Sequence, residues 1–515
     1  MNIFLSEIEC VLPRILGAIN QNEIHPLYGV SDRKFWAWRT IDFGNATNQG
    51  SAEGITMLLE ANLWPYENDY EIMVTRIKSL FSGTKKLMRK NGSLEESFPF
   101  EQSWCVSALV SYNLAGALKN FSKYLEDDVN KEFLSLILAI QKFVILNPEK
   151  HAKISNHLAV ATASLYRGYE LTGSNKTLNQ AQNYLETLMN YQNHDGGFQE
   201  YYGFDPGYQT LTMDYLANMY IDNKIEILKP VINKSLELLN YFVMPDGTFG
   251  GKFGSRGTQV YYPGGIARLA NEFPIALEIH MKMKDGIKAL STATLRGIDE
   301  GNMIPLFNSY SHAAVIDNQL KSKYVYKKMQ KDNKIRILEH AGFVIDRKRS
   351  HYTIISLFKG GYFEHYAGKK KKIMGDLPLF KNKFAYYSSA IFNQNNKYQI
   401  SEDKVIVISK FGKSNFQLQK PFLFVLGRIV FYLTRKSYHI NILLKKTIVK
   451  KLFNYKSSNR MINKRCINLG KNLSYNDEIQ GKITNSFIKA NKRSNFEQMA
   501  SANYWQISNE KIENN

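Results

Sequence analysis

The stretch DGGFQEYYGFDPGY, residues 195–208, joins two long amphipathic segments and carries the feature that decides the fold. Its opening Asp-Gly pair has counterparts in NGSLE (91–95) and DGTFG (246–250). The glycines at positions 92, 196 and 247 are 104 and 51 residues apart. The motif therefore recurs about every 50 residues, and one copy between the first two has a different sequence. A repeat of this size predicts a stacked array of helical hairpins whose glycine loops share one end.

Apolar residues recur at helical spacing on both sides of these loops. The predicted helices cover 50–64, 67–89, 98–121, 127–146, 155–172, 175–193, 205–222, 225–243 and 264–284. They pair into five to six hairpins before residue 325, the number that gives an incomplete or full α/α toroid. The loop whose sequence differs from the motif lies at 147–155, and a further loop is expected at 299–302.

The pattern of residue types changes after residue 335. The segments 341–368 and 398–412 contain short runs of β-branched residues bounded by turn residues, which predicts strands. The predicted fold class is therefore α+β with two domains, a toroid over 1–330 and a β-rich, sandwich-like domain over 331–515.

Segment 421–453 begins with PFLFVLGRIVFYL and ends with NILLKKTIVKKLF. It predicts a basic amphipathic helix with lysines and apolar residues on opposite faces. A helix packed in the core or covered by a partner is favoured over a helix on a membrane surface.

The net charge of +21 is unevenly placed. Residues 331–515 hold 35 Lys and Arg against 12 Asp and Glu, whereas residues 1–330 hold 32 against 34. This asymmetry predicts that the C-terminal third meets a polyanion or an anionic membrane surface, the alternative being a lysine-rich solvated surface. Nucleic acid is not the predicted partner, because no nucleic-acid motif accompanies the lysines.

The three cysteines are scattered and form no CxxC pair, so neither a disulfide framework nor a zinc site is indicated. GxGxxG after a strand and the P-loop pattern are both missing from the sequence, and no cofactor is expected. The first 21 residues lack the basic start and apolar run of a signal peptide, and no run of 18 apolar residues exists. These features predict a cytoplasmic protein.

Two predicted helix starts carry residues with chemical potential. Ser155 is the predicted N-cap of one helix, and Asn156 and His157 follow it. Asp205 followed by Pro206 is a second helix start, and Tyr208 lies on its first turn. The repeat places these starts on neighbouring hairpins at the same rim.

With these residues the chain resembles the heparinase II/III-like polysaccharide lyases and their alginate lyase relatives. That family pairs an α/α toroid with a C-terminal β-sandwich, and it carries an Asn-His pair followed about 50 residues later by a DGG-x-x-E…Y segment. The matching residues are Asn156-His157 and DGGFQEYYGFDPGY, with Tyr208 lying 51 residues after His157. The histidine-rich stretch with which the family's sandwich begins has no counterpart here.

The resemblance implies β-elimination on a uronate-containing polysaccharide, in a role suited to cell-surface polysaccharide metabolism. Asn156 would hydrogen-bond the uronate carboxylate and Arg256 would add a cation. Tyr208 would transfer the proton, with His157 as base or as the group that lowers the tyrosine pKa. The substrate-binding candidates are Glu200, Tyr202, Asp205 and Gln209, and no metal site is predicted.

Other interpretations of the same residues stay open. A C5-epimerase shares the proton-abstraction step. A glycoside hydrolase on the same toroid would use Glu200 with Asp205 or with Asp246 as paired carboxylates. A non-catalytic polysaccharide-binding or scaffold protein would dock its basic C-terminal region on polymer or membrane, and the candidate residues would then only cap and pack helices. The fold alone does not choose among these functions.

Overall fold

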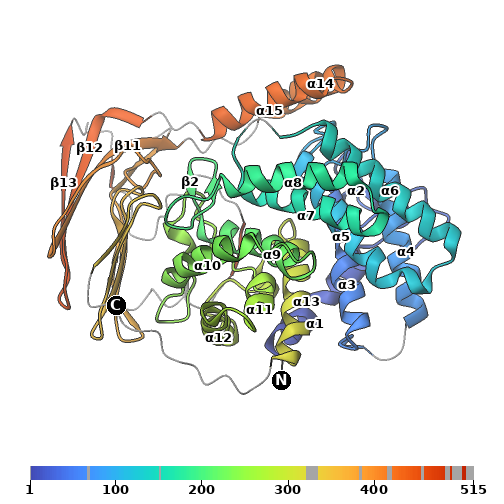
Figure 1. Ribbon diagram of the computed structural model, residues 1–515. Helices are drawn as coiled ribbons and strands as arrows, with labels where there is room; N and C mark the ends of the chain where they lie inside the picture. Colours follow the sequence, from blue (N-terminus) through green and yellow to red (C-terminus); the bar gives the residue numbers. More distant parts are fainter. Residues whose placement is uncertain are drawn as a thin grey trace.

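The structure is a computed structural model that describes residues 2–66, 70–149, 152–320, 335–381, 385–414, 420–453, 457–481, 488–489 and 502–505. A helical toroid occupies one side of the molecule and two β-sheets the other, with a pair of helices along the top (Figure 1). The predicted domain boundary near residue 330 lies outside the described residues.

Within the described ranges, six helices form a closed inner ring in which each contacts the next and the last contacts the first. They are α3 (Ser51–Glu60), α5 (Trp104–Phe121), α7 (Ser155–Thr172), α9 (Pro206–Ile221), α11 (Gly264–Leu269) and α13 (Met303–Gln319). Neighbours surround these helices, so α9 is buried along nearly its whole length. Such helices carry apolar residues on all sides.

An outer layer covers this ring. It consists of α4 (Tyr70–Leu87), α6 (Asp127–Leu146), α8 (Asn175–Met189), α10 (Leu228–Leu239), α12 (Pro274–Lys288) and α1 (Ile3–Ala18). These helices are amphipathic: α10 buries Ile232, Ser235, Leu236 and Leu239 on one stripe. The N-terminal α1 packs against α13 and thereby completes the last pair. The predicted α/α toroid is confirmed in its full, six-pair form.

The glycine loops lead from an outer helix to the next inner helix, as the repeat predicts. Gly92, Gly196 and Gly247 have φ angles of +88°, +95° and +86°, a conformation that favours glycine. A Cβ atom on Gly196 would lie 2.3 Å from the Lys234 carbonyl oxygen, so the loop packs directly on the following outer helix. The loops therefore bring the N-terminal ends of the inner helices to one rim.

Two local predictions are wrong. The segment 264–284 is two helices, α11 and α12, and Pro274 begins the second at a position where its missing N–H costs nothing. Ser155 is a helical residue rather than the N-cap of α7, which is Ile154, and the Ser155 hydroxyl donates to the Gln199 carbonyl at 2.6 Å.

The first sheet is an antiparallel meander. Its strands run in the order β3 (Arg336–Leu338), β4 (Phe343–Arg347), β5 (Tyr352–Ser356), β6 (Tyr362–Ala367) and β7 (Lys370–Gly375). In the β4–β5 register, Ile345 lies opposite Ile354. Both faces of β4 and β5 are buried.

The second sheet covers the first. It follows the order β13 (Ser474–Gly481), β12 (Ser457–Asn468), β11 (Lys404–Ser414), β9 (Tyr386–Ser388), β8 (Leu379–Lys381) and β14 (Ile488–Lys489), with β10 (Lys397–Ile400) also paired to β11. Val344 and Ile355 of the first sheet share one core with Val407 and Ile467 of the second. The predicted sandwich-like domain is confirmed.

The other face of the first sheet packs on the toroid. Phe343 lies against Phe242, with ring centroids 5.0 Å apart, and the Ala341 N–H donates to the Asp195 carboxylate at 2.8 Å. Alternate residues of β4 thus face the toroid and the second sheet, as the strand period requires. The sandwich contacts the glycine-loop side of the ring.

Segment 421–453 forms α14 (Pro421–Thr434) and α15 (Tyr438–Phe453). No residue of α14 is buried, so core packing is wrong for this helix. The predicted separation of faces also fails in α15, because Lys445 lies against the toroid while Leu443 is exposed. None of the helices within the described ranges is both long and apolar enough to cross a bilayer.

Candidate active site

Asp205 fixes the start of α9. Its carboxylate accepts the N–H groups of Tyr208 at 3.1 Å, Arg256 at 2.9 Å and Thr258 at 3.3 Å. It is therefore the N-cap predicted from the sequence, and it also ties the loop around Arg256 to the first turn of α9. The carboxylate is wholly buried, and burial raises its pKa. This side chain holds the site together and does not reach solvent.

Arg256 lies beside two tyrosines as a result. Its guanidinium carbon is 5.3 Å from the centre of the Tyr208 ring and 4.9 Å from that of Tyr201. Burial raises the pKa of Tyr208 to about 12 and outweighs the opposite effect of the Arg256 charge. The resting site thus presents a neutral phenol next to a permanent cation.

Asn156 and Glu200 form the adjoining part of the cluster. The Glu200 carboxylate accepts the backbone N–H of Asn156 at 2.9 Å and its side-chain amide at 2.8 Å. Both residues are buried, and burial raises the pKa of Glu200 to about 7 despite these hydrogen bonds. The Ser255 hydroxyl donates to the Glu200 carbonyl at 3.2 Å, which links this pair to the neighbour of Arg256.

His157 lies at the same rim and turns toward groups that the sequence did not single out. Its Nδ1 is 2.8 Å from a Glu149 carboxylate oxygen. Burial opposes the charged imidazole, but Cys105 and Glu149 raise the pKa of His157 well above its usual value. Cys105 lies on the first turn of the neighbouring ring helix α5, and burial raises the pKa of its thiol.

The remaining predicted binding residues divide into two kinds. Gln209 is buried, accepts the Phe198 N–H at 2.9 Å and donates to the Gly196 carbonyl at 3.1 Å, so it holds the loop. Tyr202 is 49% exposed and is free to contact a ligand at the surface. The structure thus brings Asn156, Glu200, Tyr208 and Arg256 together, with His157 at the side.

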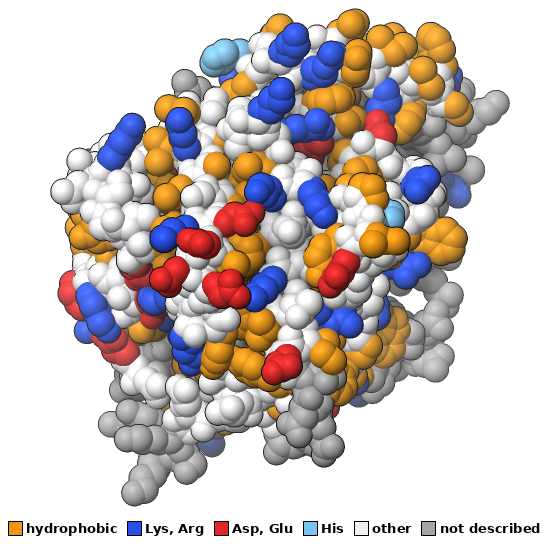
Figure 2. All heavy atoms as spheres, turned by 90° about the vertical axis from the view of Figure 1, so that its right-hand side faces the viewer, with side chains coloured by type: hydrophobic (Ala, Val, Ile, Leu, Met, Phe, Trp, Pro, Cys, Tyr) orange, Lys and Arg blue, Asp and Glu red, His pale blue; other side chains and the backbone are white. Residues whose placement is uncertain are grey.

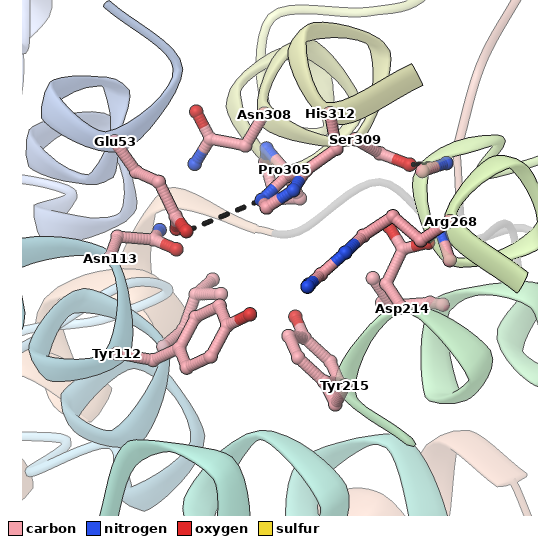
Figure 3. Close-up of a pocket in the computed structure, with 14 residues that line it drawn as sticks. Glu53, Tyr112, Asn113, Asp214, Tyr215, Arg268, Pro305, Asn308, Ser309 and His312 are labelled. Atoms are coloured by element: carbon pink, nitrogen blue, oxygen red, sulfur yellow. Dashed lines mark hydrogen bonds and ion pairs between the residues drawn. The ribbon is translucent and has the colours of Figure 1, made fainter. Parts of the chain in front are cut away.

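A second polar group lies on the axis of the ring, nearer the C-terminal ends of α5, α7 and α9. Figure 3 shows Tyr112, Tyr215 and Arg268 pointing into a small pocket, with Glu53 and His312 joined across it. The pocket has a volume of about 20 Å³, room for roughly one water molecule. A neighbouring pocket of about 300 Å³ shares Glu53, Arg268 and His312.

The charges of this axial group are matched in pairs. Glu53 lies 2.7 Å from Arg167 and 3.3 Å from His312, and Arg268 lies 2.6 Å from Asp222. Burial alone would raise the pKa of Glu53, but Arg167 and His312 lower it. Sequence reasoning missed this group, although single charged residues within apolar helices were the available signal.

In the described ranges, no group of three or more His, Cys, Asp or Glu side chains is placed to hold a metal ion.

No protein-family model matches the chain, and no curated protein matches it. Solved structures similar to it include three lyases, each covered in part. Paenibacillus xanthan lyase is 11% identical, with 80% of this chain on 45% of that one and a TM-score of 0.48. Streptomyces coelicolor A3 chondroitin AC lyase, in complex with chondroitin sulphate, is 9% identical. The match covers 80% of this chain and 66% of that lyase, with a TM-score of 0.49. Heparinase III is 12% identical, and the match covers 91% of this chain and 79% of that chain, with a TM-score of 0.47.

A sugar epimerase and family 76 glycoside hydrolases are also among the similar structures. The chain spans less than half the length of the xanthan lyase. At these identities the likeness is one of fold, and the chemistry of this chain rests on its own side chains.

Proposed function

We propose that the protein binds a uronate-containing polysaccharide and cleaves it by β-elimination at the cluster of Asn156, Tyr208 and Arg256. One observation carries the proposal. Three successive inner-ring positions, the starts of α7 and α9 and the loop before α11, deliver an amide, a neutral phenol and a guanidinium to one place. The positive ends of the α7 and α9 dipoles add to the attraction for an anion.

The reaction needs three things from the protein. A base removes the C5 proton, the electron pair left behind forms the C4–C5 double bond, and the C4–O bond breaks as the leaving oxygen gains a proton. Arg256 and the Asn156 amide bind the C5 carboxylate, and they stabilise the negative charge that moves into it as the proton leaves. Glu200 is a positioning residue, because its buried carboxylate holds Asn156.

Tyr208 is the proton-transfer residue in this proposal. Its phenolate takes the C5 proton, and the resulting phenol returns it to the leaving oxygen. Because the pKa of Tyr208 is about 12, the phenolate fraction and kcat/KM should rise about tenfold per pH unit from neutral to moderately alkaline pH. His157, whose pKa is raised by Cys105 and Glu149, is a cation in this proposal and favours binding of the polyanion rather than accepting the proton.

The proposal is tested on a panel of uronate polymers by the far-ultraviolet absorbance of the unsaturated product. Tyr208→Phe should lower the rate by at least about a thousandfold while the polymer still binds. Tyr124→Phe is the matched control, because Tyr124 is an exposed tyrosine after the far end of α5. Full activity in Tyr208→Phe would remove this residue from the mechanism.

Three other outcomes would contradict elimination and identify the rival function. New reducing ends without the absorbance rise indicate a hydrolase. Deuterium entering C5 from heavy water without cleavage indicates an epimerase. Binding without turnover of any kind indicates a polysaccharide-binding protein.

A further inference from the structure

The pair of helices α14 and α15, here called the hairpin, carries an apolar face that is exposed in the described part of the chain. Phe422 and Leu433 are 74% and 73% exposed, and Val425, Ile429 and Tyr432 are each at least half exposed. A contiguous apolar surface on a folded protein marks an interaction site. Figure 1 places the hairpin along the top of the molecule, away from the β-sheets at its α14 end.

The opposite side of the hairpin packs against the toroid. The apolar face is therefore exposed on a helix that is held in place. Phe431 stacks on Phe98 with centroids 4.5 Å apart, and the Gln102 amide donates to the Arg435 carbonyl at 3.1 Å. These contacts hold α14 against the loop that precedes α5.

The second helix is anchored in the same way. Lys445 pairs with Glu101 at 3.0 Å, and Glu101 is buried. The Asn441 amide donates to the Phe100 carbonyl at 2.9 Å, and the Tyr438 hydroxyl donates to the Asn147 carbonyl at 3.0 Å. A desolvated ion pair and two hydrogen bonds give the hairpin a defined orientation.

The charge around the apolar face indicates what covers it. Residues 420–453 contain eight Lys and Arg and no Asp or Glu. Lys420, Lys436 and Lys446 are exposed. In the space-filling view, the top of the molecule, where the hairpin lies, combines hydrophobic with basic side chains (Figure 2). A second copy of this surface would meet it with the same sign of charge, which opposes self-association.

We propose that the hairpin docks the protein on an anionic membrane surface, with the apolar face of α14 in the headgroup region and the lysines on the lipid phosphates. The 14 residues of α14 extend about 21 Å, shorter than the roughly 30 Å hydrocarbon core, so the helix lies on the bilayer and does not span it. Basic residues beside an apolar helix face are the pattern of interfacial binding. This inference is independent of the proposed catalytic function.

Vesicle sedimentation of the full chain tests the proposal. Vesicles of phosphatidylcholine with phosphatidylglycerol should bind the protein, vesicles of phosphatidylcholine alone should bind it more weakly, and added salt should reduce the difference. The double variant Phe422→Ser/Leu433→Ser should bind the anionic vesicles about a hundredfold more weakly, because two apolar side chains no longer leave water. Ile24→Ser, at an exposed isoleucine far along the chain, is the control and should bind like the wild type.

Charge and fold are checked separately. Lys436→Glu/Lys446→Glu should weaken binding to anionic vesicles and leave binding to phosphatidylcholine unchanged, and circular dichroism with a thermal melt verifies that each variant keeps its fold. A wild-type chain that fails to bind anionic vesicles at low salt would overturn the proposal. So would a dimer that forms in solution through Phe422 and Leu433 without vesicle binding, because a second copy would then cover the face.

Discussion

The rim cluster and the axial group both bury carboxylates inside the same ring of helices, but they treat the charge in opposite ways. On the axis, Glu53 lies 2.7 Å from the Arg167 guanidinium and 3.3 Å from the His312 imidazole, and its pKa is lowered. At the rim, Glu200 has amide partners and only more distant cations, and its pKa is raised to about 7. A buried carboxylate with an adjacent guanidinium keeps its charge, whereas burial raises the pKa of a carboxylate whose close partners are amide groups, despite the hydrogen bonds that they donate. The first arrangement suits structure and the second suits chemistry.

The largest effect is expected when the ion pair between Glu53 and Arg167 on the axis is removed. Arg167→Met should lower the free energy of unfolding by about 3–5 kcal/mol, because the buried Glu53 loses its main counter-charge. Urea denaturation measures the change. Lys119→Met, at an ion pair in which the lysine is half exposed, is the control and should cost less than about 1 kcal/mol. Equal effects of the two variants would show that the axial pair has no special structural role.

The second effect concerns the titration of Glu200. Folding raises its pKa from 4.5 to about 7, so its contribution to stability is present below about pH 4.5 and is lost as the pH rises through 7. Relative to Glu200→Gln, the wild type should therefore lose about 3 kcal/mol of unfolding free energy between pH 4.5 and about pH 8. Denaturant titrations at several pH values measure this difference.

Glu53 gives the contrasting pH dependence. Because its pKa is lowered in the fold, its stabilising contribution is present above its usual pKa and is lost as the pH falls through the lowered value. The difference in unfolding free energy between the wild type and Glu53→Gln should consequently shrink as the pH falls. The corresponding difference for Glu200→Gln should instead favour the wild type at acid pH. The same slope for both variants would contradict the distinction between the two regions.

The smallest effect is on catalysis at the rim. Arg256→Lys keeps the charge but loses the planar guanidinium that lies over two tyrosine rings and matches a carboxylate. It should lower kcat/KM on a uronate polymer by about tenfold to a hundredfold with little change in stability. Arg268→Lys on the axis serves as the control, and a comparable loss there would show that the polymer reaches the axial pocket.

The sequence predicted the parts of this fold that depend on local geometry. Gly196 and its equivalents identified the turns because only glycine adopts those φ angles cheaply, and Asp205 with Pro206 identified a helix start by its capping pattern. The repeat then placed Asn156 and Tyr208 at one rim. Their roles as catalytic residues stay predictions.

Contacts between distant parts of the chain could not be predicted. Glu53 pairs with His312 across 259 residues, and His157 turns to Cys105 and Glu149, neither of which belongs to a spaced motif. A lone charged residue in an apolar helix signals burial, but it carries no information about its partner.

By itself, therefore, the sequence determined the repeating helical hairpins, the β-rich second domain and the rim at which the candidate residues gather, because these follow from periodicity, capping and turn conformation. Only the tertiary structure decided that α1 closes the ring, that α14 stays exposed and that Glu200 rather than Glu53 titrates near neutral pH. Those outcomes depend on which groups desolvate one another, and desolvation is a property of the packed molecule and not of any single stretch of chain.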